Sequence, residues 1–159
     1  GDHSFTVEAW VRLDQLSWPD AADRQWLLQR KPAGTSDVNL DYGLLVQFGG
    51  YNVGYRNLSA WFGDGANLHK VETTLRLEDN DWHHVSLAYD AERRVLRFGL
   101  DEQFEEHGFE KPDFAPSGPT LIGAHSNAQG VVNQYLRGAI DELRITRAFL
   151  PPSALLRSR

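Results

Sequence analysis

The adjacent histidines His83 and His84 first suggest chemistry, because a histidine pair can bind a metal ion or move protons. They lie in segment 82–90, which alternates apolar and polar residues as a half-buried strand does. Neighbouring side chains on a strand point to opposite faces, so the pair cannot chelate one ion. Zinc needs three or four ligands, and the chain has no cysteine and no evident third ligand spaced with the pair. We therefore expect structural, hydrogen-bonded histidines.

Paired carboxylates would indicate glycoside hydrolysis, which in retaining enzymes uses two carboxyl groups about 5–5.5 Å apart. On a strand, this geometry requires acidic residues at alternate positions. No strand-like segment has such a run. Glu8 and Glu142 stand alone in their segments, and Glu102, Glu105 and Glu106 lie in a polar stretch typical of a solvated turn. The sequence offers no catalytic residue, and we predict that the chain is not an enzyme.

Aromatic residues beside amides and cations indicate a different chemistry, the binding of sugars. A pyranose stacks on an aromatic ring while Asn, Asp, Arg or Gln side chains bond its hydroxyls. We predict a ligand site from one loop and one strand, made of Trp18, Tyr55, Arg56, Asn57 and Trp61. Alternation places Tyr55, Asn57 and Trp61 on one strand face. The alternative interpretation of that face is a second core layer.

Other aromatic and polar candidates have plainer explanations. Trp10 and Trp82 lie in strand-like segments, where large aromatics fill or brace a sheet. Segment 125–130 offers an imidazole and amides, but it is equally an ordinary solvated loop.

Composition excludes several classes of protein. A chain of 159 residues is one domain by length. Its net charge of −6 with scattered basic residues argues against a nucleic-acid partner. The absence of cysteine excludes a disulfide framework. No apolar run approaches the ~20 residues of a membrane span, so we expect no membrane insertion.

The elements that must position these residues are strands. We predict them near 4–13, 25–30, 42–48, 53–62, 69–77, 82–90, 94–100, 119–124 and 135–147. Segments 82–90 and 138–147 are expected to be central and buried. The polar stretch 103–118 is expected to be a long connection, and Pro151 to start one helical turn. No linker divides the chain, so we expect a single domain over residues 1–159.

Five segments, in this order, resemble a known family. They are "FTVEAWV" at 5–11, "WHHVSLAYD" at 82–90, "LRFGLD" at 96–101, "LIG" at 121–123 and "GAIDELRI" at 138–145. Together they resemble the laminin-G-like branch of the concanavalin A-like lectin and glucanase superfamily. The resemblance implies an all-β fold, a two-sheet antiparallel jelly-roll sandwich.

The resemblance also implies function classes. One is a non-catalytic carbohydrate-binding module, lectin-like, in a larger secreted or cell-envelope protein with extracellular or periplasmic location. The alternative is a structural or protein-interaction module whose partner is a neighbouring protein domain, and a glycoside hydrolase is a further alternative by analogy. Family members usually have an opening strand before "FTVEAW", whereas this chain starts four residues ahead of Phe5 and contains no methionine. We interpret it as a module excised from a longer protein.

Many members of the family bind a structural calcium ion. The resemblance implies Asp141 of the "IDE" segment as a ligand, with Asp2 as a second candidate. Alternation suggests that Asp141 shares a face with Leu143 and Ile145, where a buried carboxylate needs a cation or hydrogen-bond donors. The alternative is that protein N–H groups satisfy it.

Overall fold

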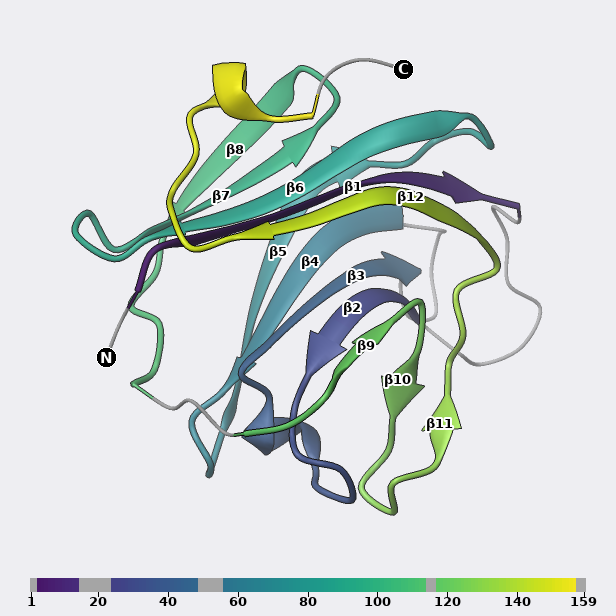
Figure 1. The fold of residues 1–159 in the computed structure, drawn as a ribbon, viewed down its shortest axis with the longest axis vertical. Helices are drawn as coiled ribbons and strands as arrows, with labels where there is room; N and C mark the ends of the chain where they lie inside the picture. The colour runs from purple at the N-terminus through teal and green to yellow at the C-terminus, as the bar shows by residue number, and fades with distance from the viewer. Residues whose placement is uncertain (1–2, 15–23, 49–55, 114–116, 157–159) are drawn as a thin grey trace.

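Two five-stranded antiparallel sheets face each other and form a sandwich (Figure 1). The computed structural model describes residues 3–14, 24–48, 56–113 and 117–156. The first sheet has the order β12-β1-β6-β7-β8 and consists of β12 (Gly138–Thr146), β1 (Phe5–Leu13), β6 (Trp82–Asp90), β7 (Val95–Leu100) and β8 (Gln103–Gly108). The second has the order β5-β4-β3-β2-β9 and consists of β5 (Leu68–Arg76), β4 (Arg56–Gly63), β3 (Tyr42–Phe48), β2 (Arg24–Arg30) and β9 (Thr120–Ile122).

Short elements complete the fold. A two-stranded hairpin of β10 (His125–Ser126) and β11 (Val132–Asn133) follows β9. The 3-10 turns are η1 (Asp37–Asn39) and η2 (Pro152–Ala154), the latter with proline at its start as expected. Within the described residues, no helix has the length and apolar character needed to cross a membrane.

The core lies between the two sheets and explains why these sequences form strands. Alternate residues such as Val7 and Val11 of β1 are buried, and they pack in one cluster with Leu87 of β6, Leu44 of β3 and Phe62 of β4. One side chain in two along each strand faces the other sheet, and this is the source of the period-two pattern. The predicted all-β, two-sheet antiparallel sandwich is confirmed.

The structure corrects the expectation that residues 103–118 form only a connection. Residues 103–108 are β8, which pairs with β7 through a turn at Asp101 and Glu102. Asp101 has a φ of 53°, the left-handed conformation that lets the turn close so tightly. Because β8 is the edge strand of its sheet and half of it faces solvent, its polar composition resembles a loop.

The structure also corrects the position of β12. The central location expected for both β6 and β12 is right only for β6, since β12 lies at the edge of the first sheet among the described strands. Its register against β1 shifts between Glu8 and Trp10, and Glu142 adopts a φ of 51° there. This bulge reverses the alternation, so Asp141 pairs with Trp10 on the outer face while Ile145 pairs with Val7 on the core side.

The C-terminal segment 147–156 packs over the outer face of the first sheet, where the buried Glu8 holds it. Glu8 is 1% exposed, and its carboxylate accepts hydrogen bonds from the Leu156 N–H at 2.7 Å and from Arg144 Nε at 2.7 Å. His84 Nε2 lies 2.9 Å from the same carboxylate. Thr6 adds a bond to the Ala148 carbonyl at 2.7 Å. Glu8 therefore joins two strands to the chain segment that covers them.

His83 and His84 have separate partners, as the sequence predicted. His83 lies between Asp101, 2.8 Å from its Nδ1, and Asp79, 2.9 Å from its Nε2. Trp10 packs edge-on against His84 at 5.5 Å between ring centres, and Arg12 lies over the Trp82 ring. Both tryptophans therefore brace the outer face of the first sheet.

The unfolding free energy is expected to fall as the pH rises through the pKa of His83. Burial alone would lower that pKa, but Asp101 and Asp79 outweigh burial and raise it above 6.5. Protonated His83 therefore stabilises the fold, fully so below the unfolded pKa of about 6.5. This stabilisation is lost as the pH rises through the folded pKa. Urea unfolding across this range measures the effect. The variant His83→Gln should remove this part of the pH dependence, and an unchanged profile in that variant would contradict the assignment.

Candidate functional site

The outer face of the second sheet, turned away from the core, carries an unusual mixture of indoles and polar groups. Cross-strand pairing aligns Trp26, Leu45 and Ser59 in one row, with Trp61 and Lys70 in the next. Trp26 and Trp61 meet edge-on at 5.4 Å between ring centres and form a small apolar cluster with Leu45, Leu40 and Leu68. This second apolar layer is the alternative interpretation of the face that the sequence allowed.

Trp61 is 1% exposed, so it does not present a free ring to solvent. Two cations cover its indole, with the Arg24 guanidinium at 4.6 Å and the Lys70 ammonium at 4.2 Å from the ring centre. Such cation–π contacts hold both charges on the outer face. The expected direct stacking of a sugar on Trp61 therefore does not fit this conformation, and the polar groups above the ring are what a ligand would meet.

The remaining predicted ligand residues are divided between places. Asn57 lies on the outer face, where its amide donates to the Thr73 carbonyl. Arg56 precedes it and lies on the opposite face, where its guanidinium donates to the Leu77 carbonyl at 3.0 Å. Arg56 therefore does not join Asn57 in one site, which corrects that grouping. Trp18 and Tyr55 lie outside the described residues.

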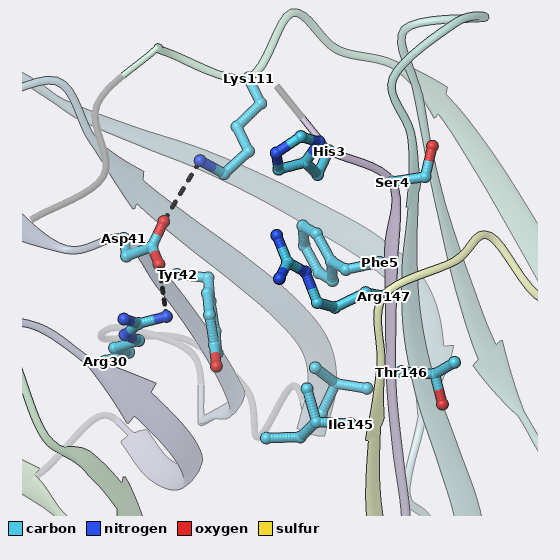
Figure 2. A pocket seen from close by; sticks show the side chains of 11 residues that line it. His3, Ser4, Phe5, Arg30, Asp41, Tyr42, Lys111, Ile145, Thr146 and Arg147 are labelled. Atoms are coloured by element: carbon cyan, nitrogen blue, oxygen red, sulfur yellow. Dashed lines mark ion pairs between the residues drawn. The ribbon is translucent and has the colours of Figure 1, made fainter. Parts of the chain in front are cut away.

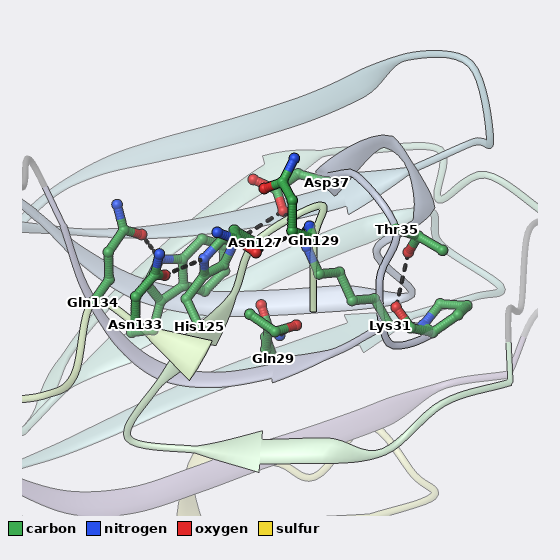
Figure 3. Close-up of polar contacts among 12 residues, drawn as sticks. Gln29, Lys31, Thr35, Asp37, His125, Asn127, Gln129, Asn133 and Gln134 are labelled. Carbon is green, nitrogen blue, oxygen red and sulfur yellow. Dashed lines mark hydrogen bonds and ion pairs between the residues drawn. The ribbon is translucent and has the colours of Figure 1, made fainter. Parts of the chain in front are cut away.

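The hairpin β10–β11 covers part of this face and is fixed to it by side chains (Figure 3). The His125 ring stacks on Trp26 at 4.6 Å between centres, and Gln134 Oε1 accepts a bond from Trp26 Nε1 at 2.9 Å. Gln29 of β2 donates to Ser126 at 2.9 Å. Gln134 follows β11 with a φ of 48°, a conformation that non-glycine residues rarely adopt and that its bond to Trp26 helps to hold.

A buried ion pair anchors the base of the hairpin. The Lys31 side chain is fully buried, and its ammonium lies 2.7 Å from Asp37 Oδ1. The same oxygen lies 2.9 Å from His125 Nε2, while His125 Nδ1 faces Asn133 at 3.2 Å. Burial alone would raise the pKa of Asp37, but the hydrogen bonds and charges of His125 and Lys31 outweigh it and hold the pKa at about 2. The anchor therefore stays ionised at neutral pH.

Four buried polar atoms on the outer face have no hydrogen-bond partner among the described residues. They are Gln29 Oε1, Asn57 Oδ1, Ser59 Oγ and Trp61 Nε1. An unpaired buried donor or acceptor costs about 1–3 kcal/mol. They are four of nine such atoms among the described residues, so unpaired polar groups are not confined to this face.

An exposed aromatic residue stands next to this face, and the sequence reasoning missed it. Tyr135 is 60% exposed and follows Asn133 and Gln134 directly, so a free ring adjoins two amides. The sequence feature that could have indicated it is the run Asn133-Gln134-Tyr135, an aromatic residue directly after two amides. Alternation predicts a last strand that begins at residue 135 and includes this tyrosine, whereas β12 begins at residue 138.

The predicted metal residue Asp141 is exposed, and its carboxylate accepts a bond from the Glu142 N–H at 2.8 Å. The expectation of a buried carboxylate facing an apolar layer is therefore wrong, because the bulge in β12 turns Asp141 outward. Within the described ranges, no three His, Cys, Asp or Glu residues gather into a metal-binding group. Asp2 lies outside those ranges.

These features define a jelly-roll sandwich with one outer sheet face partly covered by a hairpin and lined by aromatic, amide and cationic side chains. The family model of the concanavalin A-like lectin/glucanases superfamily matches residues 1–154, and the chain belongs to that family. The resemblance seen in the strand motifs is thereby confirmed.

Solved structures share the fold at low sequence identity. The CBM40 of Ruminococcus gnavus IT-sialidase bound to α2,3-sialyllactose has a TM-score of 0.75 and 15% identity, covering 95% of this chain and 79% of that one. Domain 4 of AbnA, a GH43 extracellular arabinanase from Geobacillus stearothermophilus in complex with arabinotriose, has a TM-score of 0.64 and 18% identity, covering 95% and 64%. Domains LG4-5 of the mouse laminin α1 chain have a TM-score of 0.63 and 15% identity, covering 92% and 36%. No curated protein sequence matches the chain.

Proposed function

We propose that the chain is a non-catalytic carbohydrate-binding module that holds its glycan on the outer face of the second sheet. The observation that carries this proposal is the exposed Tyr135 ring with its neighbouring amides, beside the Arg24 and Lys70 cations held over Trp61 on that face. Glycans supply many hydroxyl groups and apolar ring faces, which suits this combination. Two of the structural neighbours are carbohydrate-binding proteins by their descriptions.

The residues have separate roles in this proposal. Tyr135 stacks on a pyranose, and the amides of Asn133 and Gln134 bond the hydroxyls next to it. Lys70 and Asn57 extend the polar surface along the sheet, with Lys70 held over an indole. Trp18 and Tyr55, from the original prediction, remain proposed contributors.

A non-catalytic role fits the position of Glu8, the most deeply buried carboxylate among the described residues. Both of its oxygens are occupied by His84, Arg144 and the Leu156 N–H. A catalytic carboxylate must instead face the substrate. These contacts assign the Glu8 carboxylate a structural role.

A protein-interaction module is the second candidate, because exposed apolar side chains gather near the same hairpin. Val131 and Val132 of the hairpin are 57% and 39% exposed, and Ile122 of β9 is 54% exposed. Exposed apolar groups of this kind also suit a protein partner. We further propose an extracytoplasmic location, on the analogy of the extracellular arabinanase domain. A structural calcium ion at Asp141 stays a prediction from the family resemblance.

A glycan array decides between the two candidates, and variants then locate the site. For a glycan that binds, Tyr135→Ala should weaken affinity by about two- to tenfold, because stacking is worth about 0.5–1.5 kcal/mol. Asn57→Ala should weaken it less. Ile122→Ala is the matched control, an exposed side chain on β9 that should leave affinity unchanged.

No binding to any glycan on the array would favour the protein-interaction module. Equal binding by Tyr135→Ala and the native chain would remove the hairpin from the site. Release of reducing sugar from a bound glycan would contradict the non-catalytic assignment.

A further inference from the structure

A pocket of about 410 Å³ opens between the two sheets and is separate from the outer face. It lies where β1 and the end of β12 approach the second sheet at Arg30, Asp41 and Tyr42 (Figure 2). Pockets above about 300 Å³ are large enough to enclose a small ligand. The size suits one sugar ring.

The charges around this pocket do not balance. Arg30, Lys111 and Arg147 line it, and Asp41 is the sole carboxylate among its lining residues. Asp41 is paired with two of the cations, Lys111 at 3.3 Å and Arg30 at 3.5 Å. Arg147 has no carboxylate within ion-pair distance in the part of the chain that the structure describes. Its guanidinium is therefore available to an anion from outside.

The pocket also has an apolar wall. Phe5 and Tyr42 stack at 5.7 Å between ring centres, and Ile145 lines the pocket while 47% exposed. Burial raises the pKa of Tyr42, so its phenol keeps its proton at neutral pH. An aromatic and aliphatic wall opposite surplus cations suits a ligand with one apolar face and one anionic group.

We propose that this pocket is a second ligand site, for an acidic monosaccharide unit such as a hexuronate. Its carboxylate pairs with Arg147, whose planar guanidinium can hold a carboxylate through two parallel hydrogen bonds. Its apolar ring face packs against Phe5 and Ile145. The proposal does not depend on a glycan site on the outer face, because the two sites share none of the residues that carry them.

The test is a titration of the whole chain with sodium glucuronate, followed by the NMR shifts of backbone amides. Saturable shifts are expected around Phe5 and Arg147, and they should weaken as salt is added. Arg147→Gln should lower the affinity about tenfold, because a charge-assisted pair is lost. The glucuronate affinity of Arg147→Lys should lie between those of the native chain and Arg147→Gln, since lysine keeps the charge but lacks the two parallel N–H donors of the guanidinium.

Controls distinguish recognition of the sugar from recognition of its charge alone, and binding in this pocket from binding on the outer face. Arg12→Gln removes an exposed cation at the other end of the β1–β12 ladder and should change nothing. Tyr135→Ala should also leave the glucuronate titration unchanged, whatever it does to other glycans. Glucose should cause no saturable shifts here, and sodium sulfate should bind more weakly than glucuronate.

Three outcomes would overturn the proposal. They are equal glucuronate affinity in Arg147→Gln, equal binding of glucose, and sulfate binding as tight as glucuronate, which would indicate a site for free anions. Circular dichroism melts of each variant confirm that the fold is intact before affinities are compared.

Discussion

Replacing Glu8 with alanine is expected to lower the unfolding free energy by about 3–5 kcal/mol, as breaking a buried charged network usually does. Glu8 is 1% exposed and joins His84, Arg144 and the Leu156 N–H. Without the carboxylate, these donors lose their acceptor inside the protein. Urea unfolding of the variant and the native chain measures the difference.

The same variant should release the C-terminal segment from the first sheet. Limited trypsin digestion should then cut faster after Arg147, which begins that segment. Glu8→Gln should be intermediate, because its amide keeps one acceptor oxygen but turns N–H groups toward the other donors. Glu92→Ala, in an exposed turn, is the control and should stay within about 0.5 kcal/mol of the native chain. A comparably small loss in Glu8→Ala would show that Glu8 does not hold the segment.

Replacing Asp37 with alanine is expected to cost about 3 kcal/mol, the lower end of the range for breaking a buried pair. The Lys31 side chain is fully buried and would lose its counter-charge, whereas the Asp37 side chain is 24% exposed, so some water can reach the gap. The variant should also loosen the hairpin β10–β11, which His125 ties to the same carboxylate. The hydrogen-exchange rates of the hairpin amides, which should rise in the variant, measure that loosening.

The pH dependence gives a second readout for Asp37. Its folded pKa of about 2 lies below the ordinary 3.8, so its contribution is complete above about pH 4. The contribution is lost as the pH falls from there through 2, and Asp37→Ala should remove that part of acid unfolding. Glu106→Ala breaks the exposed pair with Arg93 and is the control, with an expected cost of at most about 1 kcal/mol. An equal effect of the two substitutions would contradict the buried anchor.

Local pattern was enough to predict most strands of this protein. In β1 and β6 alternate residues, such as Val7 and Leu87, are apolar and pack in the core, so the period-two pattern is visible in the sequence. Pattern failed for β8, whose Glu105 and Glu106 resemble a loop, because an edge strand buries too little of either face to show alternation. It also misplaced the faces of β12, since one bulged residue at Glu142 reverses every side chain beyond it.

The candidate site was predicted less completely, for a related reason. Asn57 and Trp61 do share one sheet face, as alternation requires. Alternation cannot say what covers that face, however, and the hairpin with His125 and Gln134 comes from residues far along the chain. The burial of Trp61 and the exposure of Tyr135 were therefore not predictable from local sequence.

The sequence by itself determined the class of the fold, the opposite orientation of His83 and His84, and which side chains share a face in the strands without a bulge. These properties depend on the geometry of a single strand. Tertiary structure alone decided that Glu8 is buried and holds the C-terminal segment, and that Asp37 anchors a hairpin. It also decided that Arg147 faces a pocket without a counter-charge among the described residues. Each depends on segments that meet only after folding, because burial and charge balance are set by what packs against a residue and not by its neighbours in the chain.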